Sequence, residues 1–190
     1  CAPRAGAPLP PDVSLVVSAA GGVKDAFVWI KDGLPRGKYA MPAEALIVDQ
    51  RACEFEARVI GVRVGQSVTF LNSDPILHNV HGFQSGKDVF NFALPTAGNK
   101  ATKRFKRSEI MARIMCDVHP WMRGFAGVVP HPFFAVTRAD GAFAIGGLPA
   151  GTYTVEVWHE RLARTEHQVM VTEGEKSEIA LGLELAPPKP

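Results

Sequence analysis

The feature that most constrains the fold is the alternation of short apolar runs with turn-forming residues. The chain has 190 residues, of which 18 are glycine and 15 are proline, and valine, threonine and phenylalanine cluster between them. Runs of this kind, bounded by Gly, Pro, Asn or Asp, are typical of strands. Ser67–Leu71, for example, is followed at once by the turn sequence Asn72-Ser73-Asp74-Pro75. We therefore predict an all-β protein with little helix.

Composition limits the functional classes that need to be considered. Hydrophobic residues make up 46% of the chain, which is enough for a real core. The formal net charge is only +2, whereas nucleic-acid binding normally shows a pronounced basic excess, so no nucleic-acid partner is expected. No apolar run reaches the length of about 18 residues that a transmembrane helix needs.

A change in composition at Pro130-His131-Pro132 predicts a domain boundary, because two prolines in three residues interrupt a strand. We expect an extended tether at residues 1–12, a first domain at 13–130, a second at 131–185 and a frayed tail at 186–190. In the second domain we expect a hairpin around Asp140-Gly141, with strands at Ala142–Ile145 and Ser177–Leu183. In the first we expect a loop at 84–99 and one helical turn at 107–111.

The segment Met115–Met122 carries the strongest chemical signal. It places Cys116, His119 and Met122 within seven residues, as C-x2-H-x2-M. Thiolate, imidazole and thioether form a soft donor set that suits copper. His78 follows a turn beside another predicted strand, so it can complete the set if the two strands are neighbours. Two His, one Cys and an axial Met define a blue-copper site.

These motifs resemble the cupredoxin family, and most closely its amicyanin branch with the short ligand loop. The similarity covers roughly residues 45–129 and includes the lead-in Val62-x-Val64-Gly65-Gln66-x-Val68-Thr69-Phe70-x-Asn72. It implies a Greek-key β-sandwich that holds one type 1 copper. The implied equatorial ligands are His78, Cys116 and His119.

The same resemblance assigns roles around these ligands. Met122 would be the axial ligand, and Asn79 would tie the two ligand loops together and form a hydrogen bond near the sulfur. His119, Pro120 and Trp121 would form an apolar patch through which electrons pass. The second histidine of the pair, His81, would not bind metal.

The three cysteines leave an alternative open. Cys1 and the small residues after it resemble a bacterial lipoprotein after signal cleavage, in which the N-terminal cysteine carries lipid. In an oxidising compartment, the remaining Cys53 and Cys116 suggest a disulfide. Such a bond would remove the thiolate that copper needs, and an altered metal site is a further possibility. The loop residues could also be ordinary core residues.

The stretch from residue 131 to 184 resembles the carboxypeptidase regulatory-like, transthyretin-like β-sandwich. The recognisable turns are Asp140-Gly141 and Pro149-Ala150-Gly151-Thr152-Tyr153. The resemblance implies a small prealbumin-like structural or interaction module without catalysis. No paired-carboxylate, phosphate-loop or Ser/His/Asp signature points to an enzyme.

The expected function is therefore electron transfer at the bacterial cell envelope, on a lipid-anchored protein that faces the periplasm or the outer membrane. A c-type cytochrome or a membrane oxidoreductase complex is the expected partner class. A basic cluster could serve as a docking face for an acidic partner or simply be a solvated strand; it comprises Lys100, Lys103, Arg104, Lys106 and Arg107. The alternatives are a metal-free structural subunit of a larger complex and a copper chaperone.

Overall fold

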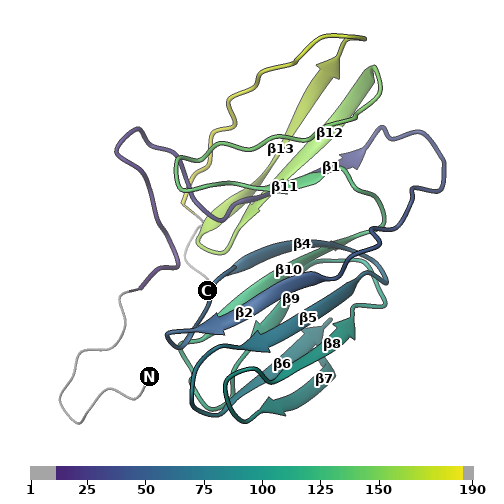
Figure 1. Cartoon of the computed structure of the whole chain (residues 1–190). Helices are drawn as coiled ribbons and strands as arrows, with labels where there is room; N and C mark the ends of the chain where they lie inside the picture. Colours follow the sequence, from purple (N-terminus) through teal and green to yellow (C-terminus); the bar gives the residue numbers. More distant parts are fainter. Residues whose placement is uncertain (1–11, 186–190) are drawn as a thin grey trace. The chain divides into compact units, whose positions relative to one another are not determined.

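The computed structural model describes residues 12–185, and the prediction of an all-β protein is confirmed there. The regular elements of this range are thirteen strands, β1 to β13. They belong to two compact units (Figure 1). One unit is Ala40–Pro130, and the other combines Val13–Tyr39 with the chain after His131.

The first unit is a β-sandwich of two sheets. One sheet has the order β4-β10-β9-β6-β7 and the other has the order β3-β2-β5-β8. The strands of the first sheet are β4 (Val59–Arg63), β10 (Arg123–Val129), β9 (Glu109–Met115), β6 (His78–Gln84) and β7 (Lys87–Leu94). Those of the second are β3 (Glu54–Phe55), β2 (Leu46–Arg51), β5 (Ser67–Asn72) and β8 (Lys100–Arg104).

Two expectations for this unit are wrong. Residues 84–99 are not a loop throughout, because β7 occupies most of the stretch and pairs with β6. Residues 107–111 do not form a helical turn, since β9 begins at Glu109. In β7 the side chains of Phe90, Phe92 and Leu94 alternate with exposed neighbours and turn toward the core cluster. This period of two is the signal of a half-buried strand.

The core of the sandwich shows why these segments become strands. Side chains of β5 alternate between buried and half-buried positions along its whole length. Phe70 is fully buried, and its ring centroid lies 5.7 Å from that of Phe90 and 6.0 Å from that of Phe92. Burial of such aromatic side chains is a main source of core stability.

The pairing of β6 with β9 positions the candidate site. The two strands are antiparallel neighbours, and His81 lies opposite Met115. The start of β6 and the end of β9 therefore lie at the same end of the sheet. His78 is the first residue of β6, and Cys116 directly follows β9. The neighbouring strands on which the copper prediction depended are thus present.

The second unit contains a four-stranded antiparallel sheet in the order β11-β1-β12-β13. Its strands are β1 (Phe27–Asp32), β11 (Phe134–Val136), β12 (Gly151–His159) and β13 (Leu162–Val171). Strand β1 lies between β11 and β12, although more than 100 residues separate it from either in the chain.

The structure therefore divides the chain differently from the predicted domains at 13–130 and 131–185. Residues 13–39 belong with the second unit, because Val28 and Ile30 of β1 share a buried cluster with Tyr153 and Val155 of β12. The backbone N–H of Ala26 also donates to the hydroxyl of Thr137, at 2.8 Å. The boundary near residue 130 is retained.

The other layer of the second unit is irregular. Phe143, Ile145, Leu181 and Leu183 pack against the buried cluster of the sheet, but their segments form no strand in the described range. The strands predicted at 142–145 and 177–183 are therefore wrong, although the apolar character that suggested them is used for packing. The pattern specified burial without specifying a pairing partner.

Several predictions fall outside the described residues. These are the tether up to residue 11, the lipidation of Cys1 and the frayed tail at 186–190. Among the described residues, no helix has the length and apolar character that crossing a membrane requires.

The long-range pairing of β1 can be tested with fragments. Residues 131–190 alone are expected to be unfolded, because they lack the strand between β11 and β12, and too few strands remain for independent stability. Residues 13–39 joined to 131–190 by a flexible linker are expected to unfold cooperatively, as are residues 40–130. Circular dichroism with thermal unfolding measures this. Cooperative unfolding of the 131–190 fragment by itself would contradict the assignment of β1.

Candidate metal centre

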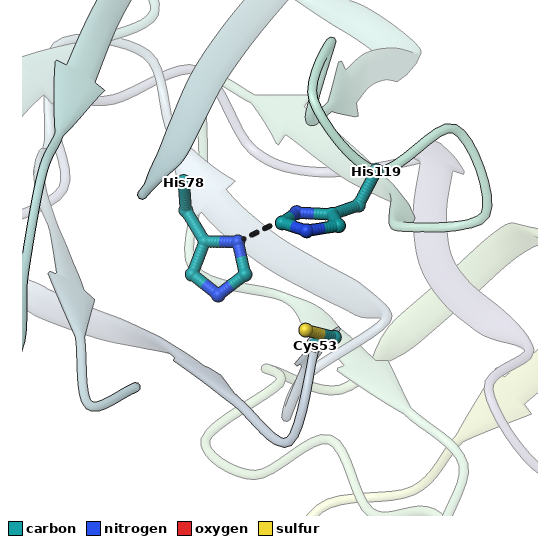
Figure 2. A group of neighbouring side chains, drawn as sticks. All are labelled: Cys53, His78 and His119. Carbon is teal, nitrogen blue, oxygen red and sulfur yellow. Dashed lines mark hydrogen bonds between the residues drawn. The ribbon is translucent and has the colours of Figure 1, made fainter. Parts of the chain in front are cut away.

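Three of the predicted ligands converge at the end of the β6–β9 pair. The Nδ1 atoms of His78 and His119 lie 3.0 Å apart, and Figure 2 shows the two rings facing each other. The sulfur of Cys116 lies 4.0 Å from Nδ1 of His78 and 3.7 Å from Nδ1 of His119. His78 and Cys116 are 0% exposed, and His119 is 7% exposed. Two imidazoles and a thiol therefore meet in a space closed to bulk solvent.

The loop after β9 is closed by its own backbone. The N–H of Cys116 donates to the carbonyl of Met122 at 3.1 Å, and the N–H of Met122 donates to the carbonyl of His119 at 2.9 Å. Met122 is buried in the same core cluster as Cys116. The C-x2-H-x2-M spacing thus forms a tight, internally bonded turn, and its three soft side chains are buried.

Asn79 joins this loop to β6. Its Oδ1 accepts the backbone N–H of Asp117 at 2.6 Å, and its Nδ2 donates to the carboxylate of Asp117 at 2.8 Å. Asn79 directly follows His78, and Asp117 directly follows Cys116. The tie between the two ligand segments that the resemblance implied is present, and the described bonds of the Asn79 side chain run to Asp117 and Asn91 rather than to the sulfur.

His81 contacts two carboxylates and does not contact the other histidines or Cys116 among its described contacts. Its Nδ1 lies 3.0 Å from the carboxylate of Asp117, and its Nε2 lies 3.2 Å from that of Asp88. Hydrogen bonds from His81, Asn79 and Asn91 outweigh the upward effect of burial and lower the pKa of Asp117. Asp117 is therefore a carboxylate at neutral pH, and His81 belongs to the network that supports the ligand loop.

Asp74 is the functional residue that the sequence prediction missed. Its Oδ2 lies 2.9 Å from Nε2 of His78, on the side of the ring away from His119. The same carboxylate accepts the backbone N–H groups of Ala52 and Cys53, each at 2.9 Å. Ala52 and Cys53 have φ values of 52° and 58°, so a left-handed turn directs two successive N–H groups at one carboxylate. In the sequence, Asp74 indicated only a turn.

The charge of Asp74 orients the ring of His78. Burial raises the pKa of Asp74, but hydrogen bonds from the Cys53 N–H, His78 and the Ala52 N–H together lower it below its usual value. An ionised carboxylate can only accept hydrogen bonds. Nε2 of His78 therefore donates to this carboxylate, and Nδ1 faces His119 and Cys116. Metal-binding histidines commonly have such a carboxylate partner.

His119 is held in its neutral form. Burial lowers its pKa, and the neighbouring His78 lowers it further. A neutral imidazole is the form that binds a metal. The His119 ring centroid lies 5.2 Å from that of Trp121, whose indole N–H donates to the carbonyl of Cys53 at 3.1 Å.

The predicted electron-transfer surface is only partly exposed. Pro120 is exposed, Trp121 is half-buried and His119 is nearly covered. Two further apolar side chains beside the histidines in sequence, Val118 at 47% and Leu77 at 44% exposure, are open to solvent. Both were missed because an exposed apolar residue cannot be recognised from its type alone.

The alternative of a disulfide between Cys53 and Cys116 is wrong. Cys116 is a free, buried thiol, whereas Cys53 is disulfide-bonded, and therefore not to Cys116. The backbone of Cys53 is fixed by the bonds to Asp74 and Trp121. Its sulfur lies within 4.8 Å of a ring nitrogen of both His78 and His119 (Figure 2).

The three converging donors fit a small soft ion. Nitrogen and sulfur bonds of about 2.0–2.1 Å and 2.3 Å separate the donors of one ion by about 3–4 Å. The distances between His78, His119 and Cys116 are 3.0, 3.7 and 4.0 Å. The donor atoms also face one another, while Nε2 of His78 is occupied by Asp74. This arrangement suits the binding of a thiophilic metal such as copper.

No family model and no curated protein matches the chain. Among solved structures, a reduced tryptophan-to-tyrosine mutant of amicyanin is 25% identical, with 46% of this chain and 85% of that chain covered and a TM-score of 0.40. Amicyanin from Paracoccus versutus is 21% identical over 53% of this chain and 96% of its own, with a TM-score of 0.41.

A copper-containing nitrite reductase from Thermus scotoductus SA-01 is 20% identical, with 51% of this chain covered and a TM-score of 0.39. The match spans only 25% of that enzyme's chain.

The bonds to Asp74 predict a pH-dependent contribution to stability. Because the pKa of Asp74 is lowered on folding, its stabilising effect is present above the unfolded-state pKa of about 3.9 and is lost as the pH falls through the folded-state pKa. Asp74→Asn is therefore expected to lower the unfolding free energy of the metal-free protein by about 1–3 kcal/mol at neutral pH. The difference from wild type should shrink in acid.

Urea unfolding at neutral and acidic pH measures this effect. Asp88→Asn is the matched control, because the Asp88 side chain is 70% exposed and contacts a histidine outside the centre. An Asp74→Asn penalty that stays the same at both pH values would contradict the role of the charge.

Proposed function

We propose that the chain is a type 1 copper electron-transfer protein. The observation that carries this proposal is the convergence of Cys116, His78 and His119 in a buried space, with donor distances of 3.0 to 4.0 Å. Met122, buried in the same loop, would supply the axial thioether. When bound, copper supplies a one-electron couple.

The chain's own contribution is to hold these donors still. Asp74 fixes the orientation of the His78 ring, while the Asn79–Asp117 bonds fix the ligand loop to the start of β6. Both anchors are made by protein groups and do not need the metal. Donors held in this way rearrange little when the charge at the centre changes, which favours fast electron transfer.

Electrons would pass at the His119 side of the centre. His119 is the most exposed of the three converging donors, and its sequence neighbours Val118 and Pro120 are exposed and apolar. An apolar surface permits close approach of a partner without the cost of removing water from charged groups. The burial of His78 and Cys116 keeps solvent away from the thiolate.

Partner and location follow as further parts of the proposal. A c-type cytochrome or a membrane oxidoreductase complex would exchange the electrons at the bacterial cell envelope. Lys103, Arg104 and Lys106 lie on or next to strand β8 and would steer an acidic partner toward the protein. A disulfide between Cys53 and Cys116 would have favoured the metal-free structural subunit, whereas Cys116 is a free thiol.

Copper loading tests the proposed function. The oxidised protein is expected to bind one Cu(II) and to absorb intensely at about 600 nm, as a thiolate–Cu(II) bond does. Cys116→Ser and His78→Ala should each remove the colour. His81→Ala is the matched control, because it removes a histidine from the same strand and should keep the colour.

Visible absorption and metal analysis of the four proteins give the result. Wild-type protein that takes up Cu(II) and stays colourless would refute a type 1 centre, and so would a colour that survives Cys116→Ser.

A further inference from the structure

A second sulfur lies beside the candidate centre. The Cys53 sulfur is within 4.8 Å of a ring nitrogen of both His78 and His119, and Cys53 is 2% exposed. The blue-copper ligand set has no place for it. The closeness of this sulfur to both histidines therefore requires an explanation of its own.

We propose that Cys53, once its disulfide is reduced, is a second thiolate ligand of this centre. The reduced protein then holds a thiophilic closed-shell ion, Cu(I) or Zn(II), through Cys53, Cys116, His78 and His119. This inference rests on the same two histidines and Cys116 as the proposed electron-transfer function. It adds a state of the site in which the set of donors is different.

The Cys53 sulfur needs only a small movement to reach an ion held by the two histidines. Tetrahedral bonds of about 2.0–2.1 Å to nitrogen and 2.3 Å to sulfur place the two donors about 3.5 Å apart. Cys116 is already near this separation, at 3.7 and 4.0 Å from the two nitrogens. The Cys53 sulfur lies within 4.8 Å of a ring nitrogen of each histidine. It therefore has to approach these nitrogens by at most about 1.3 Å. A rotation about the Cα–Cβ bond moves a sulfur by that much.

The backbone of Cys53 is tied to both histidines. Its N–H donates to the Asp74 carboxylate that also accepts from His78. Its carbonyl accepts from Trp121, whose ring lies against that of His119. A left-handed conformation is unfavourable for a cysteine, yet Cys53 adopts it at φ 58°. The surroundings thus hold this sulfur at the edge of the centre.

The chemistry balances with a dithiol as the reductant. The dithiol gives two electrons and two protons to the Cys53 disulfide, whose S–S bond breaks into two thiols, and it is itself oxidised to a disulfide. Binding of the metal then displaces the proton of the Cys53 thiol to solvent. Two thiolates and two imidazoles form the donor set of closed, tetrahedral zinc sites, and thiolates likewise select Cu(I).

Metal affinity tests the proposal on the full-length, metal-free protein. Zn(II) and Cu(I) are titrated in separate experiments against a chromophoric chelator, before and after treatment with dithiothreitol that is then removed without air. Reduction is expected to tighten the binding of at least one ion by about 100-fold or more in wild type, as an added ligand does. Cys53→Ser should show no such gain. If reduction leaves both affinities unchanged in wild type, the proposal is overturned.

Cobalt provides a direct count of the thiolates. Co(II) replaces Zn(II), and its sulfur-to-metal charge-transfer absorption grows with the number of bound thiolates. Reduced wild type is expected to absorb about twice as strongly as reduced Cys53→Ser. Equal absorption would overturn the proposal. The comparison of wild type before and after reduction needs no variant, and an absorption that does not increase on reduction overturns the proposal even if Cys53→Ser does not fold.

The two proposals fail in different ways. Blue Cu(II) protein without any effect of reduction on Zn(II), Cu(I) or Co(II) binding refutes the role of Cys53 and leaves the electron-transfer function standing. Colourless Cu(II) protein that still gains Zn(II) or Cu(I) affinity on reduction, with the gain lost in Cys53→Ser, refutes the type 1 centre and supports the two-thiolate site.

Discussion

The Asp74 carboxylate is the interaction on which the candidate centre depends. It accepts the N–H groups of Ala52 and Cys53 from the turn between β2 and β3, and it bonds Nε2 of His78 at the start of β6. One buried charge therefore joins three segments of the chain. Each charge-assisted bond contributes about 1.5–3 kcal/mol, enough to offset a left-handed conformation that costs about 1–3 kcal/mol per residue. The hydrogen bonds to Asp74, which also orients His78, thus offset the backbone strain at Ala52 and Cys53.

A second, independent anchor acts on the other ligand segment. Asn79 bonds both the backbone and the side chain of Asp117, and Asp117 in turn holds His81 and Asn91. The first anchor fixes the ring of His78, whereas this one fixes the loop that carries Cys116 and His119. The bonds of Asp74 and those of the Asn79–Asp117 pair share no polar group. Loss of one set therefore leaves the ligand segment held by the other set in place. Their combination explains how donors from distant parts of the sequence keep a fixed geometry.

The parts of the site that could be predicted are local or follow from strand neighbours. The spacing of Cys116, His119 and Met122 lies within one turn, and His78 needed only that β6 and β9 pair. Asp74 could not be recognised, because its partners at Ala52 and Cys53 come from a turn more than 20 residues earlier. The placement of β1 failed for the same reason: its partner strands lie beyond residue 130, and periodicity does not encode such pairings. The strand at residues 87–94 did carry a period of two, in Phe90, Phe92 and Leu94, and was predictable.

Cys53 shows where composition misleads. Two remaining cysteines in an oxidising compartment suggest a disulfide with each other, but the left-handed turn directs the Cys53 sulfur toward His78 and His119 and leaves Cys116 a free thiol. The disulfide of Cys53 and the thiol of Cys116 are therefore separate groups beside the same two imidazoles. The thiolate available to copper does not depend on the oxidation state of Cys53, whereas the total number of sulfur donors does. On the two proposals, this centre would keep a one-thiolate copper site under oxidising conditions and gain a second thiolate when dithiols are present.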